Sequence, residues 1–140
     1  MNRKFDFNDI LICPAIQTSI QSRDNIDIYY PDGNLPIITA PMDTVISRQN
    51  EHAFSSNRII ACLPRGEKTG FSGIESYSLH DITKMFNSGE LKKHSGYLID
   101  IANGHINDLE SITRSIKNKY GDDIYLMVGN VAHPKTYKIL

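Results

Sequence analysis

The chain has 140 residues, the usual size of one domain, and its 40% hydrophobic and 22% charged residues are ordinary for a globular protein. A net charge of −1 provides no basic surface for nucleic acid, and no apolar run approaches the roughly eighteen residues of a membrane helix. The N-terminal residues lack the apolar stretch of a signal peptide, and Cys13 and Cys62 form neither a disulfide framework nor a zinc pattern. We therefore expect a cytoplasmic, enzyme-like domain.

The first part of the chain alternates short apolar runs with one helical pattern. Leu35–Ala40 predicts a first strand. Ser47 can cap a helix that continues to about Ser56, and the next strand is expected at Arg58–Leu63. A further strand is expected at Phe71–Tyr77.

The link between the last two of these strands, Pro64–Gly70, is short. A parallel crossover needs about a dozen residues or more, so no helix fits into this link. The two strands therefore either pair as a hairpin or are joined by an unusually tight loop.

The patterns that follow are clearer. Ser78 and Asp81 form a capping box, which predicts the start of a helix. Gly96 then opens the run Tyr97–Ile101, which has no polar alternation until Asp100. Such a run is typical of a strand that is buried on both faces of a parallel sheet.

The clearest helix is predicted between Asn107, as its N-cap, and Gly121, where it ends, with Glu110 completing a capping box. Ile124–Val128 is the next buried strand, and Pro134 is expected in the first turn of a last helix. The alternation indicates an α/β fold with a parallel sheet of about five strands and four helices. Because a (β/α)8 barrel takes roughly 250 residues, the sheet is either open and complete in itself or part of a barrel finished elsewhere.

Five short segments, taken in order, resemble the IMP dehydrogenase and GMP reductase family. They are Phe5–Pro14, Ser22–Asp27, Leu35–Val45, Asp100–His105 and Gly129–Val131. The resemblance implies a partial TIM barrel: residues 1–140 would be the N-terminal part of a single (β/α)8 catalytic domain, roughly its first five strands. The Asp100–His105 run is closer to GMP reductases. Dehydrogenases usually insert a regulatory domain pair at the short link described above, and this chain has no such insertion there.

The resemblance further implies a purine-nucleotide oxidoreductase that converts GMP to IMP and ammonia with NADPH. Two alternatives stay open: an IMP dehydrogenase that lacks the regulatory insertion and uses NAD, and a non-catalytic nucleotide-binding or split-enzyme subunit. The family's cysteine nucleophile and monovalent-cation site would follow Leu140, so we expect this chain alone to be inactive. The expected partners are a purine nucleotide and either further copies, typically in a tetramer, or a second polypeptide that completes the barrel.

The active sites of such barrels form at the carboxyl ends of the strands. In the predicted elements, five polar or sulfur-bearing residues follow strand ends: Met42, Asp43, Arg65, Asp100 and Asn130. The residues that the resemblance assigns to the cofactor are Ser22, Arg23, Arg65, Asp100, Ile101 and Ala102. Those it assigns to the substrate are Met42 and Asn130.

Plainer alternatives accompany these assignments: a surface turn for Ser22 and Arg23, a solvated side chain for Arg65, a loop carboxylate for Asp100 and core filling for Met42. Reductases carry a lysine between histidines where this chain has Leu63-Pro64-Arg65-Gly66, so the positive charge is kept and the histidines are not. Gly104 is expected to serve either a positive φ or a close approach to a ligand. The histidines show no metal-ligand spacing, and both cysteines are expected to be inert core residues.

Overall fold

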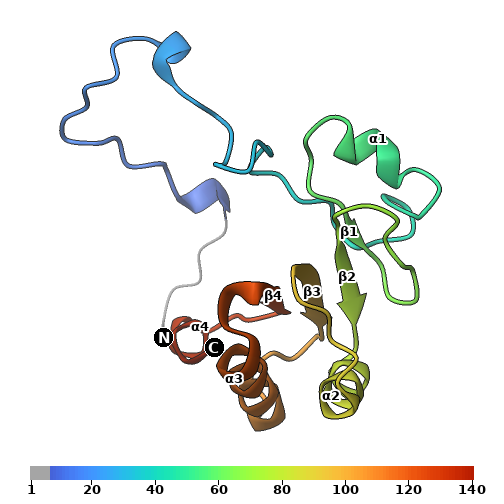
Figure 1. Ribbon diagram of the computed structural model, residues 1–140. Helices are drawn as coiled ribbons and strands as arrows, with labels where there is room; N and C mark the ends of the chain where they lie inside the picture. Colours follow the sequence, from blue (N-terminus) through green and yellow to red (C-terminus); the bar gives the residue numbers. More distant parts are fainter. Residues whose placement is uncertain (1–6) are drawn as a thin grey trace.

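The structure is a computed structural model that describes residues 7–140. Within them the chain forms an α/β fold around a four-stranded parallel sheet with the order β1-β2-β3-β4 (Figure 1). The strands are β1 (Cys62–Leu63), β2 (Ile74–Tyr77), β3 (Ser95–Asp100) and β4 (Ile124–Gly129). The helices are α1 (Glu51–Ser55), α2 (Leu79–Ser88), α3 (Asn107–Tyr120) and α4 (Pro134–Ile139), with short 3-10 turns η1 (Phe7–Asp9), η2 (Arg23–Asn25) and η3 (Gly121–Asp123). The predicted α/β class and parallel sheet are confirmed, but residues 7–140 form four strands where about five were predicted.

The predicted first strand, Leu35–Ala40, is wrong as a strand, because only an isolated parallel bridge joins Ile38 to Ile60. Past this bridge the Thr39 hydroxyl takes the place of main-chain pairing: Oγ1 accepts the Cys62 N–H at 2.8 Å and donates to the Cys62 carbonyl at 3.2 Å. The segment is also bounded by Pro36 and Pro41, which have no N–H to donate to a ladder.

The short link joins two parallel strands. Cys62 of β1 pairs with Ile74 of β2 in a parallel register, so the hairpin alternative is wrong and the tight loop is correct. Both strands are shorter than predicted. Arg58 belongs to the turn that ends α1, and the Phe71 N–H donates to the Thr69 hydroxyl at 3.1 Å instead of to a neighbouring strand.

The helix ends follow local hydrogen bonding. Ser78 caps α2 as predicted, since its Oγ accepts the Asp81 N–H at 3.1 Å, and Gly89 ends this helix with φ 75°. The helix predicted from Ser47 begins later, because the Asn50 side chain accepts the Ser47 N–H at 2.8 Å and closes a turn before α1. Asn107 is the first residue of α3 and not its cap, which is Ile106.

The helix at the end of the chain begins as its sequence predicts. Pro134 occupies the first turn of α4, and the His133 ring accepts the Lys135 N–H at 3.0 Å as an N-terminal cap.

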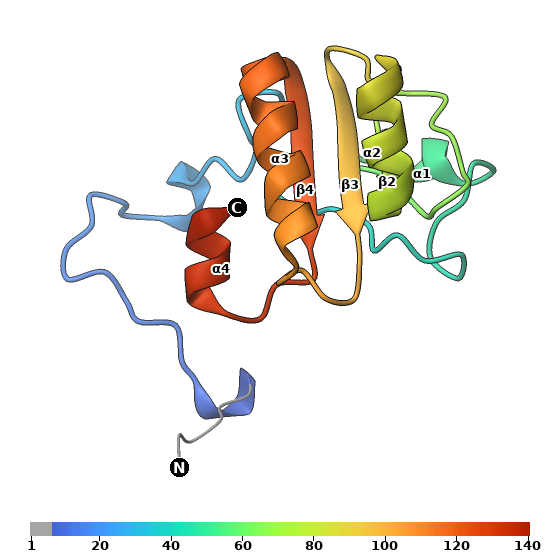
Figure 2. The same ribbon diagram turned by 90° about the horizontal axis from the view of Figure 1, so that it is seen from below.

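Buried side chains lie on both faces of the sheet. On one face α2 and α3 lie side by side (Figure 2) and enclose the largest buried cluster, Ile82, Leu91, Tyr97, Ile99, Leu109, Ile112, Ile116 and Ile124. The opposite face carries a smaller cluster of Cys62, Ile74 and Leu98. Burying each aliphatic side chain of these clusters contributes about 1.5–3 kcal/mol, so the packing of α2 and α3 stabilises the sheet.

Residues 7–30 form an extended arm that leaves the body of the domain (Figure 1), with several exposed apolar side chains such as Leu11, Ile12 and Ile16. The motif that opens at Phe5 and Asp6 begins outside the described residues. None of the helices in residues 7–140 combines the length and the apolar character that crossing a membrane requires.

Candidate functional site

Three of the expected site residues gather at one edge of the sheet. Because all strands are parallel, their carboxyl ends meet at the same edge. Arg65 leaves β1 at that edge, Asp100 is the last residue of β3, and Asn130 follows β4 directly. Asp100 pairs in register with Gly129, which brings the ends of β3 and β4 level.

Arg65 and Asp100 are in direct contact. An Nη2 atom of Arg65 lies 3.5 Å from Oδ2 of Asp100 and also donates to the main-chain oxygen of Asp100. The two side chains are 50% and 38% exposed. An ion pair this open to water is worth only about 0–1 kcal/mol, so a ligand can replace it at little cost.

The loops after β3 and β4 are joined by main-chain hydrogen bonds. Ile101 N–H donates to the Gly129 carbonyl at 2.7 Å, and Gly104 N–H donates to the Asn130 carbonyl at 2.8 Å. A Cβ atom on Gly104 would overlap the Asn130 carbonyl and lie 2.9 Å from Cγ2 of Val131. Gly104 does not have the positive φ that was one of the expected reasons for a glycine, and the space for a Cβ is taken by the chain itself.

His105 ties the same two loops together through its ring. Nε2 accepts the Ala132 N–H at 3.2 Å, and Nδ1 lies 2.9 Å from Oγ1 of Thr136 in α4. Because Nε2 is an acceptor, the proton of the neutral ring is on Nδ1 and faces Thr136. The sequence patterns assign no role to this histidine. The one signal available was its place after a glycine in a loop that follows a buried strand.

No family model matches the chain. Among curated proteins the chain is similar to the GMP reductase of Mesoplasma florum, with 26% identity over 97% of this chain and 48% of that protein. This similarity supports the resemblance to the IMP dehydrogenase and GMP reductase family that the sequence motifs indicate. The crystal structure of inosine 5′ monophosphate dehydrogenase from Legionella pneumophila shares the fold, with a TM-score of 0.61 and 20% identity over 95% of this chain and 46% of that one. The chain spans about half the length of both.

The residues that the family resemblance assigns to a cofactor fall into two groups in space. Ile101 and Ala102 continue from Asp100 along the same edge, with Ala102 exposed. Ser22 and Arg23 lie on the arm instead, and the hydrogen bonds of Ser22 close a local turn with Asp24 and Asn25. The hydrogen bonds given for Ser22 all stay within this turn, and none reaches the Arg65–Asp100 pair.

The two loop residues after the first segment are exposed. Met42 is 54% exposed, so core filling does not explain it. Its carbonyl accepts the N–H groups of Val45 and Ile46 at 2.8 and 3.0 Å, which shapes the loop that also contains Asp43. Met42 is thus available to a ligand on the carboxyl side of the Ile38 bridge.

The two cysteines differ. Cys62 is buried, and burial raises the pKa of its thiol, which a hydrogen bond with the Ser76 hydroxyl at 3.8 Å offsets only in part. An un-ionised buried thiol is unreactive, as predicted. Cys13 is exposed on the arm, so its assignment to the core was wrong: the arm does not pack on the sheet at that point.

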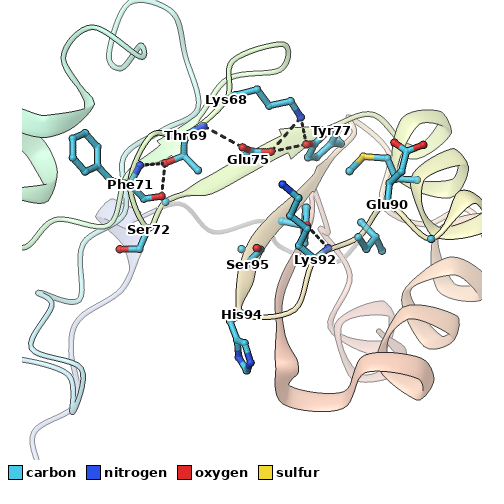
Figure 3. A pocket seen from close by; sticks show the side chains of 16 residues that line it. Lys68, Thr69, Phe71, Ser72, Glu75, Tyr77, Glu90, Lys92, His94 and Ser95 are labelled. Carbon is cyan, nitrogen blue, oxygen red and sulfur yellow. Dashed lines mark hydrogen bonds and ion pairs between the residues drawn. The ribbon is translucent and has the colours of Figure 1, made fainter.

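A separate hollow of about 790 Å³ lies between the β1–β2 loop and the start of β3 (Figure 3). Lys68, Glu75 and Tyr77 line it and bond to one another: Lys68 Nζ lies 3.2 Å from Oε2 of Glu75, and the Tyr77 hydroxyl donates to the same oxygen at 2.5 Å. Lys68 also contacts the Tyr77 hydroxyl. None of the expected binding residues lines this hollow.

Proposed function

We propose that the chain forms the cofactor-side wall of a purine-nucleotide oxidoreductase of the GMP reductase type, converting GMP to IMP and ammonia with NADPH. The observation that carries the proposal is the meeting of Arg65 and Asp100 at the carboxyl edge, beside Asn130. These residues come from three separate strand ends. Similarity to a GMP reductase along nearly the whole chain supports the same conclusion.

The exposed groups at this edge suit a dinucleotide. A carboxylate such as that of Asp100 accepts hydrogen bonds from ribose hydroxyls or from a carboxamide, and the Arg65 guanidinium can pair with a phosphate. Ile101 and Ala102 would line the same wall. The bound nicotinamide would supply the hydride, whereas these residues would hold and orient it. When a ligand binds, the Arg65 guanidinium has to release the Asp100 carboxylate and pair with the ligand instead.

On the substrate side we assign Met42 and Asn130. A thioether is flexible and polarizable and so suits the flat face of a purine. The main-chain carbonyl of Asn130 accepts the Gly104 N–H. The backbone that carries the Asn130 side chain is therefore fixed relative to the loop after Asp100. We propose no catalytic role for any of residues 1–140.

We further propose that residues 1–140 are the N-terminal part of a single (β/α)8 domain, without a regulatory domain pair at the β1–β2 link. The remaining strands would come from further residues or from a second polypeptide. Ser22 and Arg23, on the projecting arm, would meet the cofactor of a neighbouring subunit in a homo-oligomer, by resemblance a tetramer.

Binding and turnover test the proposal separately. NADPH should bind the chain with a change in nicotinamide fluorescence, and Asp100→Ala should weaken this binding about tenfold or more. Turnover is assayed with GMP and NADPH, and with IMP and NAD, on the chain together with any protein that co-purifies from its source. Failure of every dinucleotide to bind the chain, alone or in that assembly, would overturn the proposal.

A binding module without chemistry is the second candidate. The observation that favours it is the Leu63-Pro64-Arg65-Gly66 sequence, which lacks the histidines that flank the reductase lysine. Dinucleotide binding without turnover of either substrate pair in the co-purified assembly would favour this second function.

A further inference from the structure

Glu51, the first residue of α1, has a side chain that is 0% exposed. Its Oε2 accepts the Gly70 N–H at 3.0 Å and lies 3.1 Å from Nη1 of Arg48. Its Oε1 accepts the hydroxyl of Thr69. A buried carboxylate needs such partners to remain charged, and two of them belong to the loop between β1 and β2.

This loop, residues 64–73, joins two parallel neighbouring strands, a connection that ordinarily contains a helix. A second carboxylate holds its other side, since Oε1 of Glu75 accepts the Thr69 N–H at 3.1 Å (Figure 3). Glu67 adds a third contact by accepting the Arg48 N–H at 3.1 Å. The loop is therefore held by polar contacts to α1 and β2, where a helix would have used apolar packing.

Arg65 stands near the start of this loop and reaches across β2 to Asp100 on β3. Its own side chain is half exposed, so packing does little to fix it. The place of its main chain is set by Pro64, which is buried, and by the anchored residues from Thr69 onward.

We propose that Glu51 is a positioning residue for Arg65. By holding Thr69 and Gly70, its buried carboxylate keeps the helix-free loop in the one path from which the Arg65 guanidinium reaches the carboxyl edge of β3. The inference deepens the proposed function and rests on it only for the role of Arg65 at a dinucleotide. The holding of the loop by Glu51 is independent of that role.

The first test measures the loop itself. Trypsin cleaves after Arg65 and after Lys68, both on the exposed side of the loop. Glu51→Gln keeps the size of the side chain but removes its charge, and cleavage at these two bonds should become about tenfold faster. Glu90→Gln, an exposed carboxylate outside the loop, is the control and should leave cleavage unchanged. Equal cleavage of the Glu51→Gln variant and the wild type would overturn the proposal.

A second variant disturbs the contact between Arg48 and Glu51 and keeps the Glu51 carboxylate. A Cβ atom on Gly70 would overlap the guanidinium of Arg48, so Gly70→Ala should push Arg48 away from Glu51. Faster cleavage in Gly70→Ala, smaller than in Glu51→Gln, is the expected result. If Glu51→Gln does not fold, Thr69→Val replaces it, because this change removes the hydroxyl that donates to Glu51 and keeps the carboxylate. Wild-type cleavage rates in Thr69→Val would overturn the proposal.

The last test separates positioning from general stability. If Glu51 acts through Arg65, then Glu51→Gln should weaken dinucleotide binding about threefold to tenfold in the wild type and hardly at all in an Arg65→Ala background. Equal weakening in both backgrounds would assign Glu51 a purely structural role. If the wild type binds no dinucleotide, the proposed function fails, while the cleavage test still decides whether Glu51 holds the loop.

Discussion

The guanidinium of Arg65 and the carboxylate of Asp100 lie 3.5 Å apart, although one follows β1 and the other ends β3. The pair spans β2, which lies between those strands in the sheet. Each group satisfies the other in the absence of a ligand. A ligand that carries both a hydroxyl group and a phosphate could satisfy both groups at once, which is the chemistry of a dinucleotide.

Removing the Asp100 carboxylate should affect one ligand and not the other. In Asp100→Ala the dinucleotide should bind about tenfold or more weakly, because its ribose or carboxamide loses a charged acceptor. Binding of a purine mononucleotide, measured by calorimetry, should change little. An equal loss for both ligands would contradict the cofactor role of Asp100.

Gly104→Ala should destabilise the domain by about 1–3 kcal/mol, because the new Cβ would overlap the Asn130 carbonyl and force the two loops apart. Urea unfolding followed by circular dichroism measures this change. Gly129→Ala is a matched control on the neighbouring strand, since a Cβ there meets no atom within 4 Å. If both variants lose the same stability, the close contact at Gly104 is not the cause.

Glu75 should make the stability of the domain depend on pH. Burial opposes its ionisation, but hydrogen bonds from Tyr77, Lys68 and the Thr69 N–H outweigh that effect and lower the pKa of the Glu75 carboxyl. Its contribution is present above the unfolded pKa and is lost as the pH falls through the lower folded pKa. The free energy of unfolding should therefore fall less steeply below about pH 5 in Glu75→Gln than in the wild type. Parallel curves from urea titrations would contradict this.

The cysteines should react at very different rates. Exposed Cys13 should be alkylated by iodoacetamide in the folded protein, whereas buried Cys62, with its raised thiol pKa, should react only after unfolding. Intact mass spectrometry counts the adducts, and Cys13→Ser should remove the fast one. A second adduct formed without denaturant would show that Cys62 is accessible.

Much of the fold follows from local sequence signals. The buried strand around Ile99, the cap at Ser78 and the proline at the start of α4 are all set by residues close in the chain, and each prediction is confirmed. The predicted first strand failed for a non-local reason. The Thr39 N–H does donate to the Ile60 carbonyl, but toward Cys62 its hydroxyl makes the contacts. These contacts depend on where Cys62 lies, which no local pattern encodes.

The location of the candidate site could be predicted from the sequence, but the contacts between its residues could not. That Arg65, Asp100 and Asn130 share an edge follows from their places at the ends of parallel strands. Their hydrogen bonds depend on the path of a loop without a helix, which could not be foreseen. Glu51 was missed because an acid in the first turn of a helix normally faces water.

The hydroxyl of Thr39 joins its segment to β1 through a side chain, at the point where a ladder of main-chain hydrogen bonds would otherwise continue. One rotation about χ1 of Thr39 can break both bonds and leave the pairing of β1 to β4 intact. The segment would then be held by three main-chain hydrogen bonds, from Leu35 to Arg58, from Thr39 to Ile60 and from Ile60 to Ile37. A segment held by so few main-chain bonds is expected to open locally at a lower free-energy cost than the fully paired strands β3 and β4.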